Sequence, residues 1–174
     1  MLRSISEGGN DVSDIYGDCV RNLKTDESVK KYVLENIDKA IQKGHIAVYF
    51  QPVIRTLTGE LYGTEAVSRW VDPVMGLIPP DSFIPVLEEH RLIHKLDIHL
   101  INTVVSTIRK GRYRSEAITP VSFNLSECDF MLFDPIEVIE TAMGSDTWIL
   151  SFLRIEISES ALMHDGNEIG RAHV

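Results

Sequence analysis

Apolar residues recur at helical spacing in four stretches of the chain, which predicts helices over residues 28–43, 82–90, 96–110 and 135–143. The first is the clearest, because Thr25 or Asp26 can cap its start and Gly44 ends it. Its apolar positions are Val29, Val33, Ile37, Ala40 and Ile41. Asp81 is the expected cap of the second helix, Gly111 the stop of the third, and Asp134 with Pro135 the opening of the fourth.

Short apolar runs of β-branched and aromatic residues predict strands over residues 47–54, 61–69, 119–124 and 150–157. A turn at Thr58-Gly59 separates the first two, so they should pair as an antiparallel hairpin, with Pro52 restricting the first strand to an edge. Beyond the hairpin, helices and strands alternate. This alternation is typical of an α/β fold in which a parallel sheet is covered by helices.

Three oxygen-bearing side chains stand near the carboxyl ends of the predicted strands: Glu65, Asn124 and Glu156. Asn124 and Glu156 lie 32 positions apart, the length of one strand–helix–strand unit. Ligand sites of parallel α/β folds lie at the carboxyl ends of the strands. We therefore expect these three side chains to converge.

Two carboxylates and an amide form a set of hard oxygen ligands, which suits Mg²⁺, Mn²⁺ or Ca²⁺ better than zinc or copper. Such an ion would allow an acidic protein to hold a phosphate, and Arg69 could add a bidentate contact. A simpler alternative stays open. Glu65 and Glu156 would then be strand-end carboxylates satisfied by backbone N–H groups or by Arg154.

Composition narrows the range of functions. The 174 residues are enough for one domain with a sizeable core, and a formal charge of −9 excludes duplex nucleic acid as a partner. Cys19 and Cys128 are far apart and in no metal-binding spacing, which favours a reducing compartment. With no membrane span or signal pattern, the chain is expected to be soluble and cytoplasmic.

Other candidate chemistry has simpler explanations. His90 and His94 are four apart but lack the glutamate pattern of a zinc protease, so they are interpreted as solvated. The serines lack the strained turn of a serine hydrolase, and no phosphate-loop or dinucleotide glycine pattern occurs. Glu88 and Glu89 are interpreted as a charge pair at a helix end.

Several motifs follow one another in a characteristic order. The central one is Gly63-Thr64-Glu65-Ala66-Val67-Ser68-Arg69-Trp70. The others span residues 49–53, 79–85 with 88–89, 96–97, 123–126 and 156–160. Together they resemble the EAL domain family, bacterial phosphodiesterases that linearise cyclic di-GMP. Val67 stands where the family usually has Leu.

The resemblance implies a fold, a cofactor and roles for individual residues. The fold is a TIM-barrel-like variant with one antiparallel strand, and the cofactor is Mg²⁺ or Mn²⁺. Glu65, Asn124 and Glu156 match metal ligands, with Glu65 also catalytic. Glu159 matches a catalytic-site Glu that steadies a loop, and Gln51 and Arg69 match positions that line the pocket for cyclic di-GMP.

The resemblance extends over roughly residues 30–164 and lacks the family's second half, including its Asp-Asp-Phe-Gly motif and catalytic Lys. We expect a linker or the edge of a preceding domain over 1–26, a partial EAL domain over 27–164 and a non-family tail over 165–174. The chain therefore carries roughly the first half of a barrel.

Three explanations for the missing half are open: truncation, pairing of two copies in a homodimer, or a retained half domain with a regulatory role. Truncation is favoured, and the chain alone is expected to be inactive. The alternative function is a non-catalytic cyclic di-GMP sensor or protein-interaction module. An upstream sensor or cyclase domain is also left open.

Overall fold

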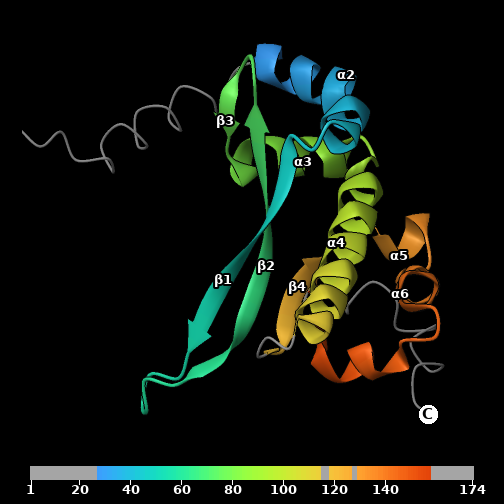
Figure 1. Ribbon diagram of the computed structural model, residues 1–174. Coiled ribbons are helices and arrows are strands. Elements are labelled where there is room, and N and C mark those ends of the chain that lie inside the picture. Colours follow the sequence, from blue (N-terminus) through green and yellow to red (C-terminus); the bar gives the residue numbers. More distant parts are fainter. Residues whose placement is uncertain (1–26, 115–117, 127–128, 158–174) are drawn as a thin grey trace, which may run out of the picture.

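A mixed sheet forms the centre of the molecule in the computed structural model, which describes residues 27–114, 118–126 and 129–157 (Figure 1). Its strands are β1 (Ile46–Ile54), β2 (Leu61–Asp72), β3 (Gly76–Ile78), β4 (Val121–Leu125) and β5 (Leu153–Ile157). They lie in the order β1-β2-β4-β5, and the short β3 pairs with β2. Within the described part of the chain, β1 and β5 are thus the two open edges.

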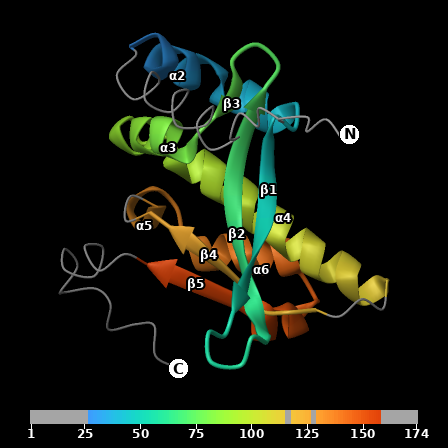
Figure 2. The same ribbon diagram turned by 90° about the vertical axis from the view of Figure 1, so that its left-hand side faces the viewer.

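The pairing directions confirm the predicted hairpin and the predicted parallel sheet. β1 and β2 run antiparallel, with Gln51 opposite Glu65, whereas β2–β4 and β4–β5 are parallel. Figure 2 shows β1 and β2 as a long twisted ribbon, with β4 and β5 beside it. The prediction that Pro52 confines its strand to an edge also holds, since β1 pairs only with β2 among the described strands.

Helices cover one face of this sheet. They are α2 (Glu27–Gln42), α3 (Pro80–Glu89), α4 (Ile93–Tyr113), α5 (Asp129–Leu132) and α6 (Pro135–Met143), followed by a 3₁₀ turn, η1 (Thr147–Phe152). The cap predicted for α6 is confirmed, because the Asp134 side chain accepts hydrogen bonds from the N–H groups of Ile136 and Glu137. Gly44 follows α2 with a φ of 71°, the left-handed conformation that ends a helix.

The longest helix, α4, joins two hydrophobic cores. Its first turns, with Ile93 and Leu96, pack with α2, α3 and Trp70 at the far end of β2. Its later turns pack with β4, α6 and η1 around Phe123 and Ile149, which are fully buried. Apolar residues three and four apart along 21 residues keep one stripe turned toward the sheet. The position of β2 relative to β4 is therefore fixed by a single rigid element.

The boundaries of α3 and α4 differ from the sequence prediction. Pro79, rather than Asp81, precedes α3 as its N-cap, and Asp81 lies in the first turn. Gly111 does not end α4, which continues to Tyr113. A Cβ atom added at Gly111 would lie 3.4 Å from the Ile118 side chain, so this segment packs close to α4, and the helix continues through Gly111 despite the low helix propensity of glycine.

The last predicted strand was too long. Residues 147–152 form η1, and only Leu153–Ile157 pair with β4. In η1, Ile149 is fully buried and the Trp148 indole N–H donates to Asp146, and residues 150–152 continue this 3₁₀ turn. The short elements β3 and α5 were not predicted, because three or four residues are too few to show a period.

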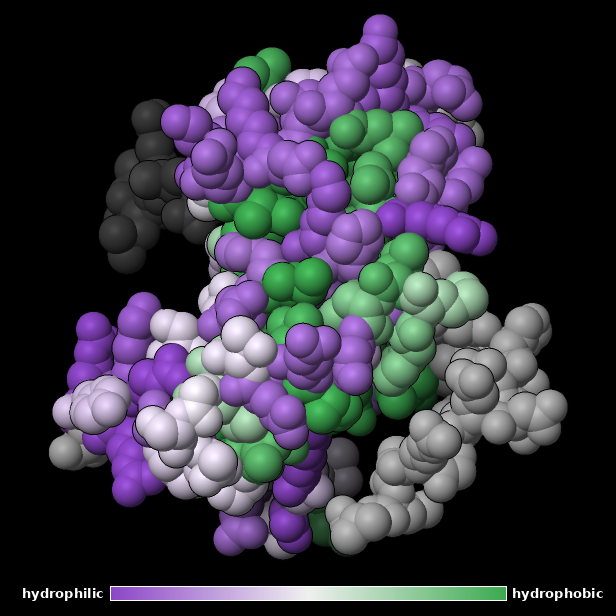
Figure 3. Space-filling model, turned by 90° about the vertical axis from the view of Figure 1, so that its right-hand side faces the viewer, coloured by the Kyte–Doolittle hydropathy of each residue, from purple (hydrophilic) through white to green (hydrophobic). Residues whose placement is uncertain are grey.

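The outer surface of α5, α6 and η1 exposes large apolar side chains. Phe130, Met131, Ile136 and Leu150 are each 45% exposed or more. Figure 3 shows the helical side of the molecule, on which apolar patches alternate with polar ones. No helix in the described ranges is long and apolar enough to cross a membrane.

Candidate functional site

Glu65, Asn124 and Glu156 come from three neighbouring strands. Asn124 and Glu156 are direct partners in the parallel β4–β5 register. On the other side, the amide nitrogen Nδ2 of Asn124 donates a hydrogen bond to Oε1 of Glu65 at 3.1 Å. This bond uses the nitrogen of the amide and not its oxygen. The three side chains thus form a row across β2, β4 and β5, with oxygen atoms from all three.

The row depends on a close approach between β2 and the segment before β4. The backbone N–H of Thr64 donates to the carbonyl oxygen of Pro120 at 2.8 Å, just before Glu65 pairs with Ser122. Gly63 stands at the contact. A Cβ atom added there would lie 2.8 Å from that same oxygen, closer than side chains normally come to backbone. The small residue that opens the central motif is therefore required by packing beside Glu65.

Replacing Gly63 by Ala is expected to lower the free energy of unfolding by about 1 to 3 kcal/mol, because β2 must move away from Pro120. Gly111→Ala is the matched control. Its new Cβ would only touch the Ile118 side chain at 3.4 Å within α4, so stability should rise by up to about 1 kcal/mol. Urea denaturation of both variants gives the comparison. Equal stability of Gly63→Ala and the parent would show that this contact does not limit the approach of the strands.

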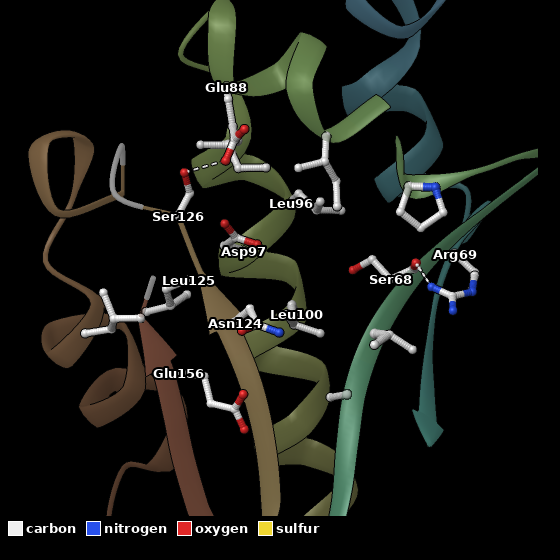
Figure 4. A pocket seen from close by; sticks show the side chains of 16 residues that line it. Ser68, Arg69, Glu88, Leu96, Asp97, Leu100, Asn124, Leu125, Ser126 and Glu156 are labelled. Atoms are coloured by element: carbon white, nitrogen blue, oxygen red, sulfur yellow. Dashed lines mark hydrogen bonds between the residues drawn. The ribbon is translucent and has the colours of Figure 1, made fainter. Parts of the chain in front are cut away.

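A cavity of about 620 Å³ lies between the middle of β2 and the last residues of β4 and β5. Figure 4 shows Asn124 and Glu156 among its lining side chains, with Ser68 and Arg69 on β2 across from them. Helices α3 and α4 form the remaining wall, through residues that include Glu88 and Asp97. The cavity combines apolar walls with a few polar groups, as small-molecule sites commonly do.

The other residues singled out in the sequence are placed differently. Arg69 lines the cavity, and its Nη1 donates to the carbonyl oxygen of Ser68 at 3.0 Å. Gln51 faces Glu65 across the β1–β2 ladder but is exposed and does not line this cavity. Glu159 lies outside the described residues. Gln51 and Arg69 were both expected to line a substrate pocket. Only Arg69 lines the same cavity as Asn124 and Glu156.

Glu88 lines the cavity, a position that the sequence analysis did not predict. It is not half of a charge pair at a helix end, because its Oε1 accepts a hydrogen bond from the Ser126 hydroxyl at 2.7 Å, inside the cavity wall. Glu89 points elsewhere and pairs with Lys30 at the surface. Ile84 and Glu88 are four apart and share the face of α3 that lines the cavity. Which face of α3 this is depends on how the helix packs, and the sequence alone did not show it.

The two histidines also separate. His90 is exposed, as expected, and its Nδ1 lies 3.1 Å from the Val86 carbonyl oxygen. His94 is not solvated in the way expected, because its Nδ1 is buried and has no hydrogen-bond partner in the described part of the chain. The difference follows from α4 beginning at Ile93, which places His94 in the first turn of a packed helix rather than in a loop.

The row of Glu65, Asn124 and Glu156 fits a hard divalent cation by its chemistry, since it offers two carboxylates and an amide oxygen. In the described residues, no group of three or more His, Cys, Asp or Glu side chains is arranged to hold a metal ion by itself. Mg²⁺ usually takes only one or two carboxylates from a protein and completes its shell with water and substrate phosphate. The row is therefore compatible with a metal that is shared with a phosphate ligand.

Comparison with known proteins shows the family of this chain. Residues 34–172 match the EAL domain family. The oxygen sensor protein DosP of Escherichia coli K12 is 33% identical over 135 residues, which cover 76% of this chain and 17% of DosP. The cyclic di-GMP phosphodiesterase PdeR of the same organism is 32% identical over 153 residues, covering 84% of this chain and 22% of PdeR. The chain thus spans only about a fifth of these relatives.

Solved structures show the same fold. The PaMucR phosphodiesterase in complex with c-di-GMP superposes with a TM-score of 0.69 at 25% identity, over 77% of this chain and 54% of that one. The EAL enzyme Bd1971 with cAMP and cyclic di-GMP bound superposes with a TM-score of 0.67 at 23% identity, over 89% and 42%. The α/β, TIM-barrel-like fold class predicted from the sequence is confirmed, and the likeness covers part of each neighbour. With a family match that takes in most of its residues, the chain belongs to the EAL domain family.

Proposed function

We propose that this chain contributes the first half of a cyclic di-GMP phosphodiesterase site, which hydrolyses the cyclic dinucleotide to its linear form. The observation that carries the proposal is the row of Glu65, Asn124 and Glu156, of which Asn124 and Glu156 line a cavity of about 620 Å³. Support comes from PdeR, which is named a cyclic di-GMP phosphodiesterase, and from PaMucR, whose structure contains c-di-GMP.

In this proposal the row holds Mg²⁺ or Mn²⁺ through the carboxylates of Glu65 and Glu156 and the amide oxygen of Asn124. When bound, the ion polarises a phosphodiester and makes water a better nucleophile. The hydrogen bond from Asn124 to Glu65 holds these two side chains together, and both would contribute oxygen ligands. Glu65 and Glu159 are proposed to be catalytic, and Arg69, on the cavity wall, to bind a phosphate oxygen. Gln51 is proposed to contact the same ligand from β1.

We further propose that the 174-residue chain alone does not turn over cyclic di-GMP. Three oxygen-bearing side chains that each give one ligand leave about half of the positions around a six-coordinate ion to other groups. No described lysine lines the cavity. Of the described strands, β1 and β5 are each paired on one side only, so the sheet is open. A second copy that covers these edges would give a homodimer. The homodimer stays a prediction. The cytoplasmic location, an upstream sensor or cyclase domain and the domain division at residues 26 and 164 also stay predictions.

The decisive experiment incubates the purified chain with cyclic di-GMP and Mn²⁺ or Mg²⁺ and separates the nucleotides by chromatography. We expect no linear dinucleotide, but weak metal-dependent binding of cyclic di-GMP in calorimetry, lost in Glu65→Ala. Product that is absent from the Glu65→Ala control would contradict the predicted inactivity. Metal-independent binding would favour a non-catalytic sensor, and no binding at all would favour a protein-interaction module.

A further inference from the structure

Two buried carboxyl groups meet behind the candidate site. Asp97 on α4 is 6% exposed, and Asp129 on α5 is fully buried. Their side chains are in hydrogen-bonding contact. Burial of one ionised carboxylate is already unfavourable, and two in contact would repel each other at short range in a medium that screens poorly. A pair of this kind is stable only if at least one member is neutral.

The hydrogen bonds around Asp129 show that one of its carboxylate oxygens has no donor in the described part of the chain. Its Oδ2 accepts from the backbone N–H of Ser126 at 2.9 Å. Its Oδ1 is buried, and no N–H or O–H group of the described chain donates to it. Asp97 shares a side-chain hydrogen bond with Asp129, so a proton on Asp97 would supply a donor to this carboxylate. One proton would then remove the charge repulsion between the two groups and give a donor to a carboxylate that has a buried, unsatisfied oxygen.

We propose that Asp97 and Asp129 share one proton in the folded protein, and that the resulting O–H···O⁻ hydrogen bond fixes the end of β4 that carries Asn124. Asp97 and Asp129 are positioning residues in this proposal. They act through Ser126, which is two residues beyond Asn124 and is bonded to Asp129 through its N–H and to Glu88 through its hydroxyl. The inference does not depend on the proposed phosphodiesterase function.

The electrostatic surroundings favour a neutral Asp97. Burial, followed by contact with Asp129 and the charge of Glu88, raises the pKa of Asp97 to about 10. Burial also raises the pKa of Asp129, while the bonds from Asp97 and Ser126 and the charge of His94 oppose this. The proton is therefore assigned to Asp97 and the charge to Asp129. The other titratable groups on this wall are Glu88 on α3 and His94 on α4, with Arg69 and Glu156 lining the same cavity from β2 and β5.

The shared proton makes stability depend on pH in a defined direction. In the unfolded chain an aspartate has its ordinary pKa of 3.8, so the folded state holds one proton more than the unfolded state between about pH 4 and 10. Stability from this source is complete below the unfolded pKa and is lost as pH rises. Between about pH 4 and 10, the contribution of this pair should lower the ratio of folded to unfolded chain about tenfold for each pH unit.

The test counts protons during unfolding. Unbuffered chain at pH 7 is unfolded in urea, and the acid released is titrated. The wild type should release about one proton more than Asp97→Asn, whose amide donates to Asp129 permanently. Asp38→Asn is the matched control, because Asp38 is exposed and bonded to Lys95, and it should release as many protons as the wild type. Equal release by wild type and Asp97→Asn would overturn the proposal.

A second set of measurements begins with the wild type and tests the positioning. In the wild type at pH 8, infrared spectra should show a protonated carboxyl group, and its absence would overturn the shared proton. The amide resonance of Ser126 should shift as the pair ionises at alkaline pH. In Asp97→Asn or in the reciprocal Asp129→Asn variant this shift should vanish. A Ser126 amide that is insensitive to the pair would overturn the link to β4.

Discussion

Replacing Glu65 by Gln is expected to lower the affinity of the chain for Mn²⁺ by a factor of about ten or more. The substitution keeps an oxygen that can accept the Asn124 Nδ2 hydrogen bond, which spans 3.1 Å in the parent. It removes one of the two carboxylate charges in the row, and affinity for a hard cation depends on the number of charged ligands. Titration with Mn²⁺, followed through the signal of free Mn²⁺ in electron paramagnetic resonance, measures the change.

Glu60→Gln provides the matched control. Glu60 lies in the β1–β2 hairpin, five residues before Glu65, is exposed and bonds only to Thr58 among the contacts of its side chain in the described region. The variant has the same net charge as Glu65→Gln, and its Mn²⁺ affinity should stay close to that of the parent. If the two variants lost affinity equally, Mn²⁺ would be responding to net charge, and the row would not be a metal site.

Trp70→Ala is expected to lower the free energy of unfolding by about 3 to 5 kcal/mol. Trp70 is fully buried, and its ring meets Phe83 edge-on with centroids 5.7 Å apart. Its indole N–H also donates to Asp72 at 3.3 Å. Asp72 is 5% exposed and accepts further bonds from the Tyr32 hydroxyl and from the N–H groups of Val74 and Met75. Chemical denaturation, followed by circular dichroism, checks the loss.

Trp148→Ala is the control for removal of an indole. Trp148 is only partly buried, stacks beneath the Arg112 guanidinium at 4.3 Å and lies in the other core. Because less apolar area is lost and water can enter the gap, the expected loss is about 1 to 2 kcal/mol. A Trp70→Ala variant no less stable than Trp148→Ala would show that the core around α2 and α3 contributes little to global stability.

The sequence predicted the longer elements well, because a helix of 16 residues or a strand of 9 repeats its pattern often enough to be recognised. Both the hairpin at Thr58-Gly59 and the parallel pairing of β4 with β5 follow from turn residues and element order. The start of β5 could not be predicted. Residues 150–152 are as apolar as a strand, but contacts of Ile149 and Trp148 with the core hold them in a 3₁₀ turn.

Part of the candidate site was also open to sequence reasoning. Polar side chains at the ends of apolar strands stand out against their neighbours, so the pattern of residues was enough to select Glu65, Asn124 and Glu156. Glu88 could not be chosen over Glu89 with the same assurance. The two are adjacent and identical, and only the orientation of α3 sends one to Ser126 and the other to Lys30.

By itself, the sequence determined which elements form, in what order, and which residues carry the family motifs, since these depend on local period, turn chemistry and residue type. The tertiary structure decided which side chains meet. Gly63 lies against Pro120, Asn124 bonds Glu65, and Asp97 reaches Asp129 across segments far apart in the chain. These side-chain contacts depend on the packing of α4 across two hydrophobic cores. The residue pattern of one segment does not specify how far that segment lies from another segment of the chain.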